Sequence, residues 1–269
     1  MTKGFTDASR WANVKLDKET EHAAALATLN FLKRVKAVAE KAATLVGPDA
    51  TAEHLVVDFD TFDAKHLDFV IATLASGEAR ISAESGKIKA EETSITGLWR
   101  VEDEGKQKFI FASIPEAILN VVKKGVRHLP IPEAAPEGVF SSPAIIKELS
   151  AALDACNLET LDFDPPHTTE LTRQPIEKAD MTWIKSVLGT GGTEIWLSGF
   201  ANARMQSTGY CGIWRSTLLN KAGKTLLDSF VVALLPPEVP ASPDEFEDSV
   251  RECEELIEWL ENDLARGVL

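Results

Sequence analysis

A four-residue frame occurs twice in this chain: Gly97-Leu98-Trp99-Arg100 returns as Gly212-Ile213-Trp214-Arg215. Only six of the 269 residues are tryptophan, so two in the same frame are not expected by chance. The flanking segments correspond as well, with an offset of 114 residues before a one-residue insertion and 115 after it. Such a repeat constrains the whole fold, because both copies are expected to adopt the same structure.

Each copy shows the same succession of patterns: a helix, two strands, the Trp-Arg strand, and an apolar strand that ends at a proline. In the first copy these elements are expected at residues 67–74, 79–83, 88–93, 97–101 and 109–115, and in the second at 181–188, 193–197, 203–208, 212–216 and 230–236. Strands clustered between helices predict an α+β fold rather than a βαβ series. We therefore expect two similar lobes from an internal repeat, each a mostly antiparallel sheet packed with helices.

The domain organisation follows from where helices and prolines stand. Residues 1–50 are predicted to be an N-terminal helical segment, with a long Ala- and Leu-rich helix that stops at Gly47-Pro48. Residues 51–127 would form the first repeat lobe, and the proline-rich residues 128–140 a semi-rigid linker. Residues 141–269 would then form the second repeat lobe, including an amphipathic C-terminal helix.

Composition limits the classes of function. A net charge of −14 argues against a nucleic-acid groove, which needs clustered Lys and Arg. The three cysteines form no Cys-x-x-Cys pair, so we expect neither a zinc ribbon nor a disulfide framework, and a reducing compartment fits best. Because no segment approaches the ~18 to 20 apolar residues that cross a bilayer, we predict a cytoplasmic protein without membrane insertion.

Motifs that would carry chemistry are weak. The glycines of residues 188–192 follow a predicted helix, whereas phosphate loops open one, so they are interpreted as a helix C-cap and turn. The five histidines include no His-x-x-x-His pair, and Ser94, Ser207 and Cys211 lie in no Gly-x-Ser-x-Gly elbow. Cys156 and Cys253 are interpreted as small core residues. We accordingly predict no catalytic residues, no metal site and no cofactor.

The repeated strand itself offers a candidate binding site. Alternation places Trp99 and Trp214 on one face of their strands and Arg100 and Arg215 on the other. One interpretation is structural: a core indole, backed by an arginine that pairs with a carboxylate such as Glu78 or Glu194. The other interpretation makes these same six residues part of a surface for a protein partner, because Trp and Arg are enriched at binding hot spots.

The paired pattern resembles a known family. Leu74-x-x-Gly77-Glu78-Ala79 leading to Gly97-Leu98-Trp99-Arg100, with its second copy from Leu188 to Arg215 and on to Pro237-Glu238, is similar to the HyaF/HupH/HoxQ family of hydrogenase expression and formation proteins. The resemblance covers roughly residues 55 to 240. The copies differ at Gly192-Thr193, where the first has Glu78-Ala79, so any role of Glu78 would belong to one lobe only.

The resemblance implies accessory work in maturing an uptake [NiFe]-hydrogenase rather than an enzymatic activity. It implies two partners: the iron–sulfur-bearing small-subunit precursor before export, and a thioredoxin-like accessory protein. The leading hypothesis is therefore a cytoplasmic chaperone that holds this precursor. The alternatives are an enzyme with a small-molecule site in a cleft between the lobes, and a metallocofactor carrier that uses cysteine.

Overall fold

The protein is described from a computed structural model that covers residues 16–199 and 202–269. The expectation for the first part of the segment 1–50 lies outside these residues. Two compact units are formed: the first from Met1–Gly77, Ala90–Pro115 and Ala241–Leu269, the second from Glu78–Lys89 and Glu116–Pro240. The chain thus passes between the units more often than the predicted linear succession of domains requires.

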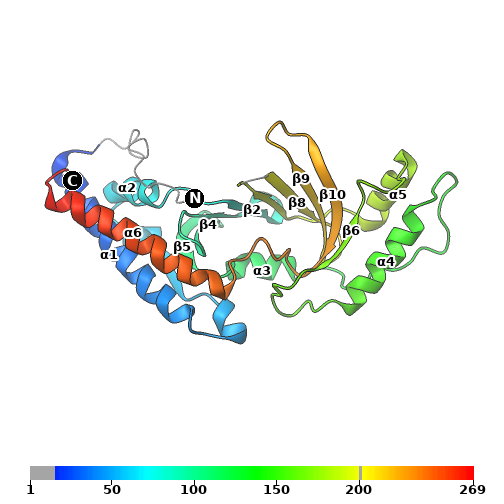
Figure 1. Cartoon of the computed structure of the whole chain (residues 1–269), viewed down its shortest axis with the longest axis horizontal. Helices are drawn as coiled ribbons and strands as arrows, with labels where there is room; N and C mark the ends of the chain where they lie inside the picture. Colours follow the sequence, from blue (N-terminus) through cyan, green and yellow to red (C-terminus); the bar gives the residue numbers. More distant parts are fainter. Residues whose placement is uncertain (1–15, 200–201) are drawn as a thin grey trace. The chain divides into compact units, whose positions relative to one another are not determined.

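Three helices belong to the first unit: α1 (Lys18–Ala42), α2 (Ala64–Leu74) and α6 (Phe246–Ala265). The Asp17 carboxylate caps α1 by accepting a hydrogen bond from the Thr20 N–H at 3.0 Å. Helices α1 and α6 lie side by side (Figure 1). The amphipathic face of α6 is buried in the same apolar cluster as α1, which explains why the C-terminal helix joins the first unit instead of the expected second lobe.

The strands of the first unit are β1 (Leu55–Asp58), β3 (Ile88–Glu92), β4 (Leu98–Asp103) and β5 (Lys106–Phe111), in the order β1-β5-β4-β3. Strand β5 runs antiparallel to both β1 and β4. Its register pairs Leu98 with Phe111 and Arg100 with Phe109, so these four side chains share one face. Both phenylalanines belong to the cluster built by α1, α2 and α6, and these helices therefore cover that face.

The second unit contains six strands in the order β2-β7-β8-β9-β10-β6. Their bounds are β2 Ala79–Ala83, β6 His167–Glu170, β7 Glu194–Leu197, β8 Asn202–Ser207, β9 Ile213–Leu219 and β10 Thr225–Val232. Helices α3 (Glu116–Val122), α4 (Ser142–Ala155) and α5 (Lys178–Leu188) complete the unit. The pairs β2–β7, β7–β8, β8–β9, β9–β10 and β10–β6 are all antiparallel.

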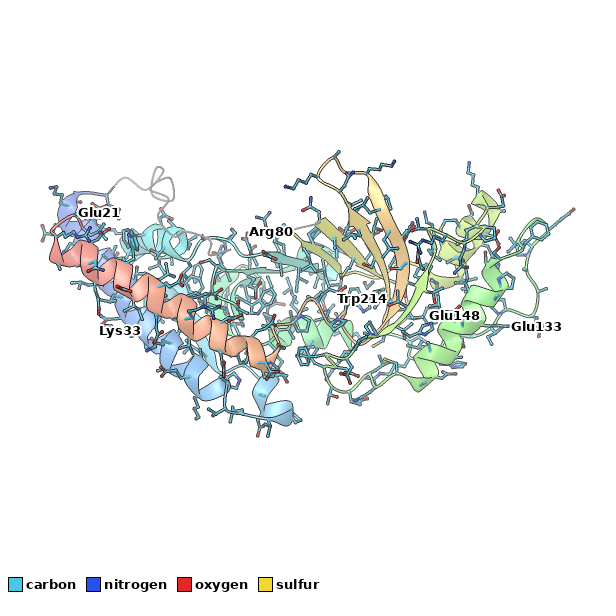
Figure 2. The ribbon with its side chains drawn as sticks, in the orientation of Figure 1. Glu21, Lys33, Arg80, Glu133, Glu148 and Trp214 are labelled. Carbon is cyan, nitrogen blue, oxygen red and sulfur yellow. The ribbon has the colours of Figure 1, made fainter. Side chains whose placement is uncertain are left out.

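Helix α4 packs beside β6 and β10 in Figure 1. Its buried stripe contains Ile145, Leu149 and Leu153. From the same helix Glu148, labelled in Figure 2, reaches β6 and accepts a hydrogen bond from the Thr169 hydroxyl at 2.8 Å. The helix therefore joins the sheet through both apolar packing and a polar contact at its edge strand.

Asp180 on α5 fixes the beginning of α4. Its carboxylate accepts hydrogen bonds from the N–H groups of Phe140, Ser141 and Ser142 and from the Ser142 hydroxyl, at 2.6 to 3.0 Å. Ser141, rather than Ser142, precedes the helix, and no serine side chain caps it. A carboxylate from a distant helix thus supplies the cap of α4.

The order of elements in the two matching segments agrees with the sequence pattern. The first contains α2, β2, β3, β4 and β5, and the second α5, β7, β8, β9 and β10. Strand β2 is nevertheless paired with β7, and the register places Ile81 opposite Ile195. These two isoleucines occupy the same position in the two segments. The protein is an α+β protein with antiparallel strands, as expected.

Candidate functional site

Both repeated tryptophans are core residues. Trp99 is 0% exposed, and Trp214, labelled in Figure 2, is 1% exposed. The indole N–H of Trp99 donates to the Ala112 carbonyl at 3.1 Å, and that of Trp214 donates to the Ala233 carbonyl at 3.2 Å. Each indole thus has its polar atom satisfied inside the protein. The structural interpretation holds for Trp99 and Trp214, and the partner-surface interpretation of the two indoles is not supported.

The two arginines pair with carboxylates, but not with the expected ones. Arg100 donates to Glu91 on β3 at 2.7 Å. Arg215 forms a bidentate pair with Asp228 on β10, at 3.0 and 2.7 Å, and this pair raises the pKa of the guanidinium. Glu91 and Asp228 each lie on the strand next to that of the arginine they bind. The alternation of side chains in the sequence indicates which residues of one strand share a face. It does not indicate which strand lies next to the strand of the arginine.

Glu78 and Glu194 have other surroundings. The Glu194 carboxylate accepts from Arg204 at 3.0 Å and from Gln206 at 2.7 Å, both on the neighbouring strand β8. The Glu78 carboxylate lies against Gly199. Within the second unit, Glu194 is therefore paired with Arg204 and Gln206 rather than with Arg215.

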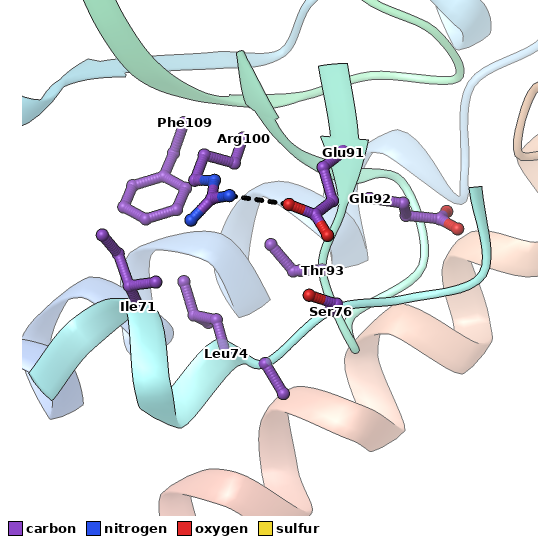
Figure 3. Close-up of a pocket in the computed structure, with 9 residues that line it drawn as sticks. Ile71, Leu74, Ser76, Glu91, Glu92, Thr93, Arg100 and Phe109 are labelled. Carbon is purple, nitrogen blue, oxygen red and sulfur yellow. Dashed lines mark hydrogen bonds and ion pairs between the residues drawn. The ribbon is translucent and has the colours of Figure 1, made fainter. Parts of the chain in front are cut away.

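A small pocket of about 70 Å³ lies beside Arg100 in the first unit. Figure 3 shows the guanidinium between Phe109 and Glu91, with Ile71 and Leu74 of α2 below. The ion pair with Glu91 already satisfies the charge that would attract a ligand. At this volume the pocket suits a water molecule or two rather than a substrate, since a water occupies about 30 Å³ of liquid.

A larger pocket, of about 260 Å³, lies in the second unit and was not singled out from the sequence. We call it the glycine-loop pocket. It is formed by the end of α3, the loop after α5, the loop between β8 and β9, and the start of β9. Its lining residues are Val121, Val122, Lys124, Thr190, Gly191, Gly192, Thr193, Ser207, Thr208, Gly209, Tyr210, Cys211, Gly212 and Trp214.

Hydrogen bonds hold the two loops together. The Gly191 N–H donates to the Ser207 carbonyl at 2.9 Å, and the Thr193 N–H donates to the Ser207 hydroxyl at 3.0 Å. A Cβ at Gly191 would stand 2.2 Å from the Ser207 hydroxyl, so only glycine fits there. Gly189 has a φ of 64° and ends α5, which confirms the predicted C-cap and turn.

The electrostatics of the glycine-loop pocket are close to neutral. Its ammonium group, Lys124, is paired with Glu84 at 2.8 Å, and this contact lowers the pKa of the glutamate. Burial raises the pKa of the Cys211 thiol, although Arg127 nearby opposes the effect. The thiol therefore stays protonated at neutral pH and is a poor nucleophile. The pocket offers hydrogen-bonding groups without net charge.

The remaining cysteines fit a structural role to different degrees. Cys253 on α6 is fully buried, and burial raises its pKa to about 12. Cys156 is only partly buried, which departs from the expectation of a core residue. Over residues 16–199 and 202–269, no group of three or more His, Cys, Asp or Glu side chains could hold a metal ion. No helix in the same ranges is long and apolar enough to span a membrane.

The two Trp-Arg segments share their main-chain hydrogen bonds as well as their order of elements. In both, the loop after the helix is bonded to the end of the second strand, and the turn before the Trp-Arg strand is closed in the same way. The matching bonds are Gly77 N to Glu92 O and Gly191 N to Ser207 O, Ser94 N to Leu74 O and Gly209 N to Leu188 O, and Thr93 N to Leu98 O and Thr208 N to Ile213 O.

Known proteins that this chain resembles are named for hydrogenase expression, formation or operons. Residues 139–260 match the family described as HupH hydrogenase expression protein, C-terminal conserved region. Hydrogenase expression/formation protein HoxQ of Cupriavidus necator is 25% identical over 211 residues, which are 76% of this chain and 73% of that protein. Hydrogenase-1 operon protein HyaF of Escherichia coli is 24% identical over 219 residues, or 77% of this chain and 74% of that protein.

A solved structure is also similar in part. Hydrogenase expression protein HupH from Thiobacillus denitrificans matches 43% of this chain and 92% of its own, at 23% identity and a TM-score of 0.36.

Proposed function

The chain belongs to the family of hydrogenase expression/formation proteins, and on that premise we propose that it is a chaperone of [NiFe]-hydrogenase maturation. It binds the precursor of the iron–sulfur small subunit in the cytoplasm, before export. A thioredoxin-like hydrogenase accessory protein is its second partner. The family membership carries this proposal, because relatives from several bacteria bear names for hydrogenase expression or formation.

The lining of the glycine-loop pocket favours binding over catalysis. A general acid or base needs a group whose pKa lies near the working pH. Here the Lys124 ammonium is engaged by Glu84, and the Cys211 thiol has a raised pKa. Main-chain groups, hydroxyls and an indole are what remains in the lining. Such groups suit recognition of a polypeptide, and we expect the protein to act without an enzymatic activity of its own.

The architecture is proposed to come from a duplicated unit. Three pairs of matching main-chain hydrogen bonds, the matching order of elements and the buried indoles Trp99 and Trp214 support this origin. The pairing of Ile81 with Ile195 is also what two copies of one unit would form if they associated through the same strand. A duplicated unit gives the chain two related frameworks, of which one can diverge to bind a partner.

The proposed function is tested by retention of the precursor. The tagged chain and the small-subunit precursor would be produced together, purified under reducing conditions and compared with the tagged thioredoxin-like accessory protein. We expect the chain to retain the precursor and to release the mature small subunit. The proposal is wrong if the accessory protein retains the precursor and this chain retains none.

A further inference from the structure

Gly192 is the one glycine of the loop after α5 whose presence the fold does not explain. Gly189 needs its positive φ of 64°, and Gly191 has no room for a Cβ. A Cβ at Gly192 would be in ordinary contact, at 3.8 Å, with the main chain of Glu84 and Ser85, and its φ does not lie in the left-handed region. The Ser85 N–H donates to the Gly192 carbonyl at 3.2 Å, so the turn between β2 and β3 lies on one side of this glycine. The residue is exposed and lines the glycine-loop pocket, so its other side is open to a ligand.

The same loop presents hydrogen-bonding groups without partners. Among the residues that the structure describes, the main-chain N–H groups of Thr190 and Gly192 donate to no acceptor. Thr193 is 3% exposed, and both its N–H and its carbonyl are bonded to Ser207. Its hydroxyl lines the pocket and has no partner among the same residues. This hydroxyl is therefore left for a ligand or water in the pocket to bond.

Charge and size narrow the class of ligand. The loop follows the C-terminal end of α5, where the helix dipole is negative and disfavours anions. Lys124 does not reverse this, because Glu84 neutralises it. At about 260 Å³ the pocket is smaller than the ~300 to 1,000 Å³ typical of cofactor and small-molecule sites. A neutral ligand of small cross-section fits best.

We propose that the glycine-loop pocket binds an extended segment of the client polypeptide through its main chain. Peptide groups are neutral and carry both a donor and an acceptor. Client carbonyls accept from the N–H groups of Thr190 and Gly192, and a client N–H donates to the Thr193 hydroxyl. Small client side chains face the apolar part of the lining that Val121 and Val122 provide. This inference rests on the proposed function, since the client is the small-subunit precursor.

The test combines the full-length precursor with synthetic peptides that tile its sequence. Affinities for the full chain would be measured by fluorescence anisotropy for the peptides and by retention for the precursor. Gly192→Leu should weaken peptide binding by about tenfold or more, because it adds a large side chain to the lining of the pocket. Gly192→Ala should have a smaller effect than Gly192→Leu. Thr193→Val should weaken binding about threefold to tenfold, as expected for one hydrogen bond.

Two controls separate binding from folding. Thr225→Val makes the same chemical change at an exposed threonine that does not line the pocket, and should leave affinity unchanged. Circular dichroism and melting temperature should be like wild type for Gly192→Ala and Thr193→Val, because neither creates a clash or breaks a bond.

The outcomes distinguish this inference from the proposed function. If wild type retains the precursor and Gly192→Leu and Thr193→Val retain it equally well, the pocket is not the client site while the function stands. If wild type retains no precursor but the thioredoxin-like protein does, the function fails and this inference fails with it. Weakened binding of both precursor and a tiled peptide by the two variants, with Thr225→Val unaffected, supports both.

Discussion

The segment around Trp99 and the segment around Trp214 share a framework of main-chain hydrogen bonds and differ in the groups that contact it. Both bury an indole whose N–H donates to the carbonyl of the alanine that directly follows the next strand, Ala112 after β5 and Ala233 after β10. The residue before the conserved glycine shows the difference. The Thr96 N–H donates to the Glu252 carboxylate of α6, whereas the Cys211 N–H donates to the Val126 carbonyl. The framework tolerates different partners so long as each buried N–H finds an acceptor.

The same comparison locates the candidate site. At the position of Gly192 the first segment has Glu78, and the pocket beside Arg100 in the first unit is small and has an ion pair in its lining. In the second segment four glycines, Gly191, Gly192, Gly209 and Gly212, line an open pocket. Shared features therefore indicate what the fold requires, and features of one segment alone indicate where binding could have been added. Each of the following measurements tests this distinction.

The largest effect should come from the shared indoles. Trp99→Ala and Trp214→Ala should each lower the free energy of unfolding by about 3 to 5 kcal/mol, because each leaves a large cavity and an unsatisfied carbonyl. Urea denaturation of the full chain measures the loss, and hydrogen exchange locates it in each unit. Trp→Phe at either position should cost less. An effect of only one of the two alanine variants would contradict a shared framework.

A smaller but still large effect should be confined to the second segment. Asp180→Ala should cost about 2 to 3 kcal/mol, because several N–H groups at the beginning of α4 lose their acceptor. His66 stands at the corresponding position of the first segment. His66→Ala should change stability by less than about 0.5 kcal/mol. Equal losses at the two positions would show that the cap is not particular to α4.

Asp180 also predicts a dependence of stability on pH. Burial opposes ionisation of this carboxyl, but hydrogen bonds from Ser142, Glu177 and Phe140 outweigh it and lower the pKa from 3.8 to about 2. A folded pKa below the unfolded value stabilises the protein above the unfolded value. The stabilisation should be lost as the pH falls from about 4 to about 2. Acid denaturation of wild type and Asp180→Asn measures it, with a shallower slope expected for the variant.

Replacement of the two arginines by lysine should lower the free energy of unfolding by modestly different amounts. Arg215→Lys should cost about 1 kcal/mol, because lysine cannot reproduce the bidentate pair with Asp228. Arg100→Lys should cost less than about 0.5 kcal/mol, since the single contact with Glu91 can be kept and the guanidinium is more exposed. Thermal denaturation of both variants at low and high salt checks the order. A larger loss for Arg100→Lys would reverse the comparison.

The smallest effect concerns Glu252, the acceptor found only in the first segment. Burial raises its pKa above the ordinary 4.5, and the hydrogen bond from Thr96 opposes this. Ionisation of a group with a raised folded pKa opposes folding, so wild type should lose stability relative to Glu252→Gln as the pH rises above 4.5. At pH 7 the two should differ by less than about 1 kcal/mol. A wild type that gains stability over the variant with rising pH would contradict this.

Elements with a local signal were predicted well. The helix at residues 181–188 is part of α5, and the glycine after it ends the helix. The Trp-Arg strands also occur where expected. Their apolar neighbours begin earlier than expected and end four residues before Pro115 and Pro236. These features depend on side-chain periodicity and on conformational preferences of a few adjacent residues.

Features that depend on distant contacts were not predicted. The partners of Arg100 and Arg215 lie on adjacent strands, whose register no short segment specifies. The carboxylate that caps α4 lies 38 residues beyond Ser142. The glycine-loop pocket needs α3, the loop after α5 and the β8–β9 loop together, so the sequence showed its glycines but gave no sign of a pocket.

Sequence by itself determined the succession of helices and strands and the repetition of a Trp-Arg strand, because these follow from spacing along the chain. Only the tertiary structure decided that α6 packs with α1, that β2 pairs with β7, and that the two indoles are core residues. The physical reason is that burial and hydrogen-bond pairing are satisfied by whichever partner comes close in space. This chain has several carboxylates and apolar faces. The residues adjacent to each in the sequence do not determine which of them a given arginine, N–H group or helix contacts.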